Sequence, residues 1–186
     1  MNTRGRIINA ADDLYKVSSF REVSIDSIAA TAGVTKKTFY YHFRSKDDLL
    51  VAFLEAKEQP TLERYQAWAG KNGMPSEKIT RIFETLAAEA SEQSWVGCGF
   101  IRAVMELAKF PGHPALQVAQ RHRERFEAWF KTELDAAGYQ DSEILSKAIV
   151  MLLDGAIIRL IANKDRSYPL SAAITAQRLL LRNLIA

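Results

Sequence analysis

The segment that most constrains the fold is SIDSIAATAGVTKKTFYYHF at residues 24–43, two short helical patterns on either side of one glycine. Ser24 is a typical helix N-cap, and Gly33 stands where a helix ends in the left-handed conformation. Thr35 can cap a second helix directly after that turn, and the small Ala29 lets the two helices approach closely. This spacing predicts a helix-turn-helix.

The second of these helices has two different faces. Phe39 and Phe43 are four residues apart and therefore point to the same side, which we expect to be the core. The opposite side carries hydroxyl and ammonium groups, which can donate to phosphate oxygens or base edges, and tyrosine rings that can pack on a thymine methyl. The residues turned away from the core are Lys37, Thr38, Tyr40 and Tyr41.

The charge of this region supports contact with a polyanion. The chain has a formal net charge of only +3 and a pI near 9.0, which by itself does not indicate nucleic acid. Between positions 36 and 46, however, lysine and arginine occur without any acid, and such a local patch can steer toward phosphate. The alternative is a solvated amphipathic helix whose lysines and tyrosines serve only solubility.

Residues 27–50, SIAATAGVTKKTFYYHFRSKDDLL, resemble the signature of the TetR family of bacterial transcriptional regulators, and the resemblance covers about residues 4–55. It implies a recognition helix, Lys46 on a backbone phosphate, and a dimer that binds a palindromic operator, usually as a repressor. Many members of the family have glycine where this chain has Lys37. Together with the helix caps, the resemblance implies that DNA is contacted by Ser24, Thr35, Lys36, Lys37, Thr38, Tyr40, Tyr41, His42 and Lys46.

The remaining sequence is also helical in pattern, with glycine and proline between the periodic segments. We therefore expect an all-α fold with a helix-turn-helix DNA-binding domain at 1–48 and a helical ligand-binding and dimerisation domain at 49–186. No apolar run is long enough to span a bilayer and no secretory signal is recognisable, so a cytoplasmic location is expected. About nine helices are predicted, at 4–17, 24–33, 35–43, from 45 until Pro60 kinks or ends the helix, and at 76–92, 100–109, 114–137, 142–163 and 171–186.

The segment 142–163, SEILSKAIVMLLDGAIIRLIAN, is apolar nearly all round, and the last predicted helix is similar. A helix of this kind is buried on more than one side, either inside a monomer or against a second chain. Asp154 and Arg159 within it can pair, line a pocket or reach solvent. The preferred interpretation is an interface with two helices from each chain, formed by Ile149, Leu153, Gly155, Ile157, Leu160, Leu180 and Leu184.

Aromatic and sulfur-containing side chains concentrate in the middle of the chain, around the glycine-flanked VGCGF at 96–100. They can line an apolar ligand pocket or simply form the core, and Arg102 can neutralise an anionic ligand. His113 is expected to cap or pack a helix start, and His122 to face solvent. The candidate ligand-binding residues are Trp95, Cys98, Phe100, Arg102, Phe126, Trp129 and Met151.

Among function classes, a repressor released from DNA by a small molecule is the most consistent with these patterns. The alternatives are a thiol-based sensor of oxidants or electrophiles acting through Cys98, and a DNA-binding activator or architectural protein without a ligand. One cysteine cannot form an internal disulfide, and the three histidines lack metal-ligand spacing. No nucleophile, base or phosphate loop suggests an enzyme, so we expect neither cofactor nor metal.

Overall fold

The computed structural model describes residues 2–183, and within that range it consists of nine α-helices without any strand. The predicted all-α fold is therefore confirmed for this part of the chain. None of these helices is long and apolar enough to cross a membrane. The helices are α1 (Thr3–Tyr15), α2 (Ile25–Ala32), α3 (Lys36–His42), α4 (Lys46–Ala69), α5 (Pro75–Glu89), α6 (Gly99–Leu107), α7 (Pro114–Ala136), α8 (Ser142–Asn163) and α9 (Ser167–Leu181).

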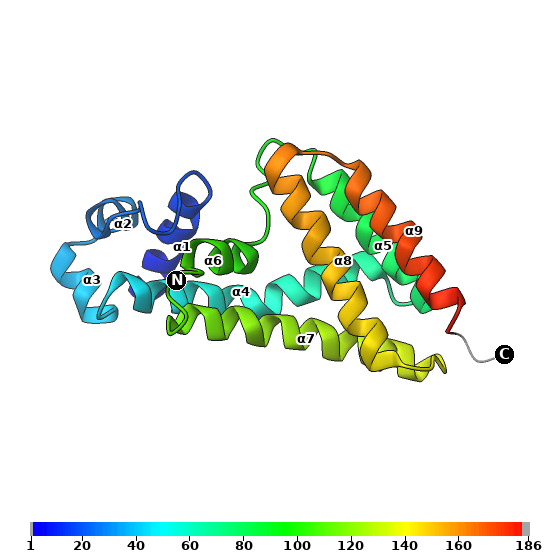
Figure 1. Cartoon of the computed structure of the whole chain (residues 1–186). Helices are drawn as coiled ribbons and strands as arrows, with labels where there is room; N and C mark the ends of the chain where they lie inside the picture. The colour runs from blue at the N-terminus through cyan, green and yellow to red at the C-terminus, as the bar shows by residue number, and fades with distance from the viewer. Residues whose placement is uncertain (1, 184–186) are drawn as a thin grey trace.

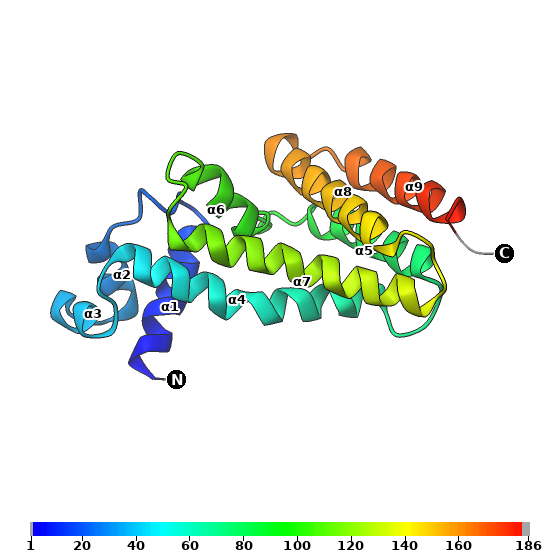
Figure 2. The ribbon, with the colours of Figure 1, turned by 60° about the horizontal axis from the view of Figure 1, so that its bottom comes forward.

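The molecule is elongated, and a different group of helices forms each of its two ends (Figure 1). The first three helices gather at one end, while α5, α8 and α9 form the other end. The long helices α4 and α7 lie side by side and span the distance between the two ends, as the turned view in Figure 2 also shows. The short α6 lies between α1 and the C-terminal helices.

Buried side chains form two clusters rather than one. The first joins the three N-terminal helices to the start of α4 and contains Tyr15, Phe39 and Phe53, but also Phe100 of α6 and Val118 of α7. The helix-turn-helix end is therefore packed on α6 and α7. The expected boundary after residue 48 falls inside α4, whose first half belongs to this cluster.

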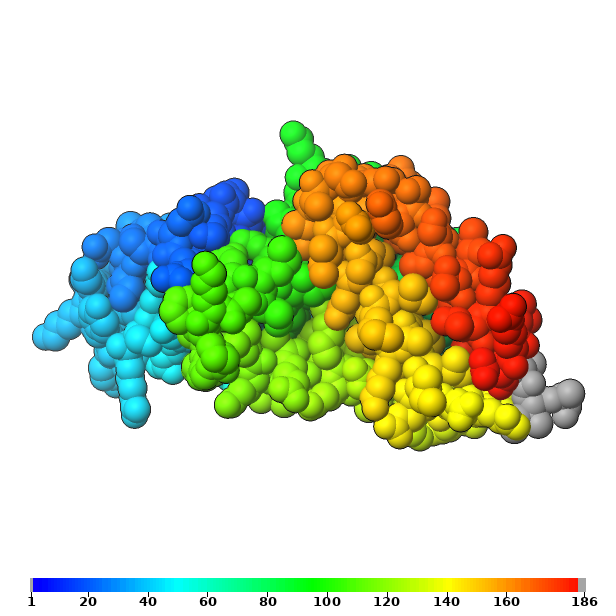
Figure 3. Space-filling model, viewed as in Figure 1, coloured from blue at the N-terminus to red at the C-terminus, as the bar shows by residue number. Residues whose placement is uncertain are grey.

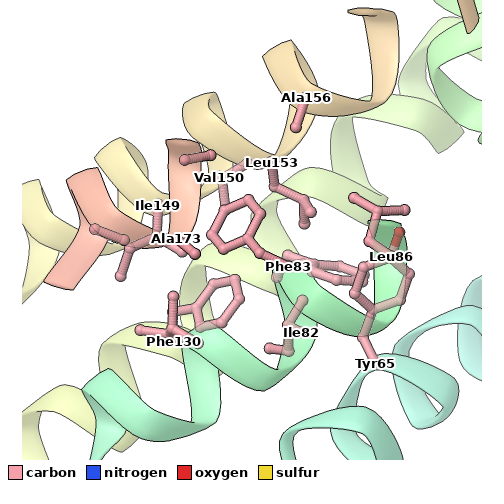
Figure 4. Packing of buried hydrophobic residues seen from close by; sticks show 14 of the residues in the cluster. Tyr65, Ile82, Phe83, Leu86, Phe130, Ile149, Val150, Leu153, Ala156 and Ala173 are labelled. Atoms are coloured by element: carbon pink, nitrogen blue, oxygen red, sulfur yellow. The ribbon is translucent and has the colours of Figure 1, made fainter. Parts of the chain in front are cut away.

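The second cluster fills the space between the end of α4 and helices α5, α7, α8 and α9. Figure 4 shows Ile149, Val150 and Leu153 of α8 among Ile82, Phe83 and Phe130 of the neighbouring helices. Apolar burial on this scale is the main source of stability for the C-terminal end.

The predicted interface residues of α8 and α9 must be corrected. The side chains of Ile149, Leu153, Ile157, Leu160 and Leu180 are buried in the core of the single chain, so they are not available to a partner. Gly155 is exposed, and Leu184 lies outside the described residues. The apolar pattern of α8 runs round most of the helix, so periodicity could not decide which side faces inward. The exposed apolar residues of α8 and α9 are instead Ile144, Met151, Ile158, Tyr168, Leu170, Ile174, Leu179 and Leu181.

Of the two outcomes expected at Pro60, a kink or the end of the helix, the structure excludes the end. Helix α4 continues through Pro60 to Ala69 and ends at Gly70, whose φ is +74°. Pro60 is exposed, while Leu62 and Tyr65 after it pack into the second cluster. Tertiary packing of that face therefore outweighs the missing N–H of proline.

We expect Pro60→Ala to raise the free energy of unfolding by about 2 kcal/mol, because alanine restores a donor for the carbonyl of Ala56 and removes the steric conflict. Chemical denaturation followed by circular dichroism measures this change. Gln66→Ala, further along α4, is the control and is expected to change the free energy by less than about 0.5 kcal/mol. A destabilised Pro60→Ala protein would contradict the interpretation.

Candidate nucleic-acid interface and adjoining pockets

The ends of α2 and α3 are fixed by side chains that bind the backbone. The hydroxyl of Ser24 accepts from the backbone N–H of Ser27 at 3.0 Å, and the backbone N–H of Ser24 donates to the hydroxyl of Ser27 at 3.1 Å. Gly33 ends α2 with a φ of +63°. Thr35 then accepts from the N–H of Thr38 at 3.1 Å, so α3 begins where the sequence predicted.

Arg6 of α1 holds the turn between these helices, a role that the sequence did not suggest. Its Nη2 donates to the carbonyl oxygens of Ala32 at 2.7 Å and Gly33 at 3.1 Å. These are carbonyls at the C-terminal end of α2, where a cation is electrostatically favourable. The partner positions are far apart in sequence, so no local signal identifies this contact.

The outward face of α3 has the composition that the helical projection predicted. Phe39 and Phe43 are buried, whereas Lys37 and Tyr40 are exposed and the side chain of Tyr41 is 84% exposed. His42 lies at the margin, with its ring edge-on to Tyr41 at a centroid distance of 5.0 Å. An aromatic side chain held almost completely in solvent loses burial energy, which makes this face a candidate contact surface.

Two of the lysines expected at DNA have partners within the chain. The Nζ of Lys36 lies 3.0 Å from a carboxylate oxygen of Asp26, and the Nζ of Lys46 donates to the carbonyl of Arg21 at 2.6 Å. Exposed pairs of this kind contribute little to stability, so either lysine can turn toward a phosphate. Lys37 has no ion pair among the described residues and already points outward.

A hollow of about 180 Å³, here called the outer pocket, lies between α1, α4 and the start of α6. Cys98, Phe100 and Arg102 line it, as the sequence suggested, together with Lys57 and Arg64 of α4. A second hollow of about 20 Å³, the inner pocket, adjoins it between α4, α7 and α8. The inner pocket is lined by the expected Trp95, Cys98 and Phe126, and also by Tyr65, Trp68, His122 and Arg123.

Two of the predicted ligand-binding residues lie elsewhere. Trp129 stacks on Phe130 at a centroid distance of 4.6 Å and lines a separate small hollow beside α5. Met151 is on the outer side of α8 and is 68% exposed. Both side chains have the aromatic or sulfur-containing character expected of a ligand pocket. Their positions round their helices, however, turn them away from the outer and inner pockets.

Arg102, which the sequence suggested could neutralise a ligand, has partners within the chain. Its guanidinium donates to the carbonyl oxygens of Tyr15 at 2.6 Å and Ser18 at 3.0 Å. Glu106, one turn later, accepts from the backbone N–H of Phe20 at 2.7 Å and lies 3.6 Å from Arg102. These contacts, here called the α6–α1 tie, fasten the end of α1 to α6.

His122 is buried rather than solvent-facing. Its side chain is 1% exposed and stacks on Phe100 at a centroid distance of 3.6 Å. Neither ring nitrogen has a hydrogen-bond partner among the described residues. Burial, with a smaller effect of Arg123 and Arg125, lowers the pKa of His122 from its ordinary 6.5 to about 3. The charged neighbours in QRHRERFE concealed its position four residues before the buried Phe126.

The other polar residues that the sequence left open now have positions. Asp154 pairs with Arg123 at 2.9 Å, while burial raises the pKa of its carboxyl group. Arg159 is exposed, with its guanidinium over the ring of Tyr168. His113 caps α7 as expected, since its Nδ1 accepts from the N–H of Ala115 at 3.1 Å.

Comparison with known proteins identifies relatives of the N-terminal helices. The family model described as "Bacterial regulatory proteins, tetR family" matches residues 7–53. The HTH-type transcriptional regulator SrpR of Pseudomonas putida is 38% identical over 58 residues, which are 31% of this chain. Those residues cover only 27% of SrpR, so this likeness does not extend to the C-terminal helices.

Solved structures resemble the whole chain. A TetR transcriptional regulator from Streptomyces avermitilis is 26% identical, with a TM-score of 0.83 over 97% of this chain and 98% of that protein. A TetR-family transcriptional regulator from Streptomyces coelicolor is also 26% identical, with a TM-score of 0.81 over 97% of this chain and 94% of that protein.

We expect the protein to lose stability in mild acid because of His122. Below about pH 6.5 the unfolded chain binds a proton at this residue, whereas the folded chain stays neutral until about pH 3. Between pH 7 and pH 5 this difference costs about 2 kcal/mol. Urea unfolding of His122→Phe, which cannot titrate, is expected to show a pH dependence weaker by that amount. Equal pH dependence in both proteins would exclude a buried neutral imidazole.

Proposed function

Because the chain belongs to the TetR family of bacterial transcriptional regulators, we propose that it is a homodimeric repressor, bound to a palindromic operator and released by a small molecule. The observation that carries the proposal is the outward face of α3, where Lys37, Tyr40 and Tyr41 project from a capped helix at one end of the molecule. A helix of this kind reads base edges in the major groove.

In the proposed complex the residues of this face have different tasks. Lys37 and Tyr41 contact base edges, while Tyr40 and Thr38 flank them. Lys36 and Lys46 exchange their intramolecular partners for backbone phosphates, which fixes the orientation of α3 without reading sequence. The hydrogen bonds from Arg6 to the turn hold α2 and α3 in a constant relative orientation.

The dimer is proposed to form through the outer sides of α8 and α9. Ile144, Met151 and Ile158 are exposed at two-turn intervals on α8, and Ile174 and Leu181 are exposed on α9. These two helices lie side by side on the face turned toward the viewer in Figure 3. Exposed apolar residues on two neighbouring helices are typical of interaction sites, and two copies would bury them in a four-helix contact.

A test of DNA contact is Tyr41→Ala, for which we expect roughly tenfold or greater loss of affinity with an unchanged melting temperature. The side chain is almost completely exposed, so its removal does not disturb the core. Fluorescence anisotropy with a duplex selected by the wild-type protein measures the affinity, which should also fall steeply with salt. Val17→Ala, a comparably exposed apolar residue outside α3, is the control. Unchanged binding by both Tyr41→Ala and Lys37→Ala would refute the proposed interface.

A test of the dimer is Ile174→Arg, which places a charge in the centre of the proposed contact. We expect sedimentation velocity to give a dimer for the wild type at micromolar concentration and a monomer for the variant, because an unpaired buried charge is strongly unfavourable. Val104→Arg, at an exposed apolar position of α6, should leave the dimer intact. A monomeric wild-type protein would contradict the proposed dimer.

A further inference from the structure

The outer and inner pockets adjoin each other and share part of their lining. Thr61 and Arg64 of α4, and Gly97 and Cys98 of the loop before α6, line both of them. The outer pocket, about 180 Å³, is of the same order as the ~150 Å³ cavity that admits benzene in another protein. The inner pocket, about 20 Å³, has room for one small polar group. The combined space fits a molecule with one ring and a short substituent.

The linings of the two pockets contain more cations than carboxylates, and most of these cations are already neutralised. Lys57 lies 2.6 Å from Asp12, and Lys16 pairs with the same carboxylate and with Asp13. Arg102 belongs to the α6–α1 tie. Glu89, on the rim of the inner pocket, is exposed to solvent, and Arg123 is paired with Asp154.

Arg64 is different from these cations. Among the described residues no carboxylate lies within ion-pair distance of its guanidinium, which rests over the rings of Trp68 at 5.3 Å and Tyr65 at 5.9 Å. Stacking leaves the N–H donors in the plane of the guanidinium free. A planar anion in the shared part of the pockets can therefore take two hydrogen bonds from Arg64.

His122 supplies an independent sign that the space takes a ligand. It is almost fully buried and lines the inner pocket, yet neither of its ring nitrogens has a hydrogen-bond partner within residues 2–183. Buried polar groups are nearly always hydrogen-bonded, and a neutral imidazole offers one donor and one acceptor. A hydroxyl or carbonyl substituent that reaches the inner pocket satisfies one of them.

From these observations we propose that the effector is a small aromatic carboxylate, with its carboxylate on Arg64, its ring against the aromatic walls and a polar substituent toward His122. The proposal rests on the function proposed above, because it names the chemical class of the molecule that releases the repressor. The outer pocket, which alone has room for the ring, suits a flat ring because Phe20, Phe53 and Phe100 are among its lining residues. The sequence suggested Arg102 as the anion-binding residue, but its guanidinium is already hydrogen-bonded to backbone carbonyl oxygens at the end of α1.

The test uses three probes of the same shape and different charge, namely benzoate, benzamide and benzamidine. Isothermal titration calorimetry of the full chain is expected to give the tightest binding for benzoate, with benzamide weaker by roughly tenfold or more and no detectable binding of benzamidine. Salicylate, which adds a hydroxyl, is expected to bind more tightly than benzoate. Equal affinity for the three probes, or no benzoate binding at millimolar concentration, would overturn the proposal.

Variants test whether Arg64 is the residue that binds the carboxylate. Arg64→Gln is expected to lower benzoate affinity to the level of benzamide and to leave benzamide binding unchanged. Arg21→Gln, an exposed arginine that also rests on an aromatic ring but lies outside both pockets, is the matched control. Benzoate binding that is as tight in Arg64→Gln as in the wild type would refute the assigned class.

A separate measurement distinguishes this proposal from the proposed function. Fluorescence anisotropy on operator DNA reports release, whereas calorimetry without DNA reports binding. Charge-selective binding without any change in DNA affinity supports the assigned ligand class and contradicts the release mechanism. DNA binding that responds to all three probes equally contradicts the ligand class and leaves the regulator intact.

Discussion

The orientation of the helix-turn-helix depends on the hydrogen bonds between α6 and the end of α1. Arg102 holds two carbonyl oxygens there and Glu106 holds the N–H of Phe20, while the guanidinium of Arg102 also lies over the ring of Phe20 at 4.8 Å. Hydrogen bonds from charged side chains to the backbone in a partly buried site are stronger than hydrogen bonds between neutral groups. Because the first turn of α6 also lines the outer pocket, one short helix touches both the pocket and the DNA-binding end.

Helix α4 is the second rigid connection. Phe53 and Leu54 of its first half pack in the N-terminal cluster, and Leu62 and Tyr65 of its second half pack in the C-terminal cluster. Arg64, which carries the proposed anion site, lies on the same helix. A ligand at Arg64 and Cys98 therefore touches both α4 and the segment that leads into α6. The proposed release mechanism needs only a change in the angle between these two helices.

The sequence was sufficient wherever the physical cause is local. The caps at Ser24, Thr35 and Ser45, the turn at Gly33 and the inward phenylalanines of α3 all follow from neighbours within a few residues. The failures have non-local causes. The inner side of α8 is decided by its packing on α7 and α9, and the burial of His122 by the approach of Phe100 from α6. The engagement of Arg102 depends on the carbonyl oxygens of Tyr15 and Ser18, which are distant in sequence, and no periodicity in the chain reports them.

Helix α8 contributes to two surfaces at once. Ile157 lines the inner pocket, and a Cβ at Gly97 would lie only 2.6 Å from Cγ1 of Ile161, whereas Met151 and Ile158 face outward. In the proposed dimer, α8 would form both the wall of the pocket and part of the contact between the two copies. By thermodynamic reciprocity, any effect of pocket occupancy on self-association is matched by an equal effect of self-association on ligand affinity. In that proposed arrangement the abundance of the protein becomes a second input, which shifts the ligand concentration at which it responds.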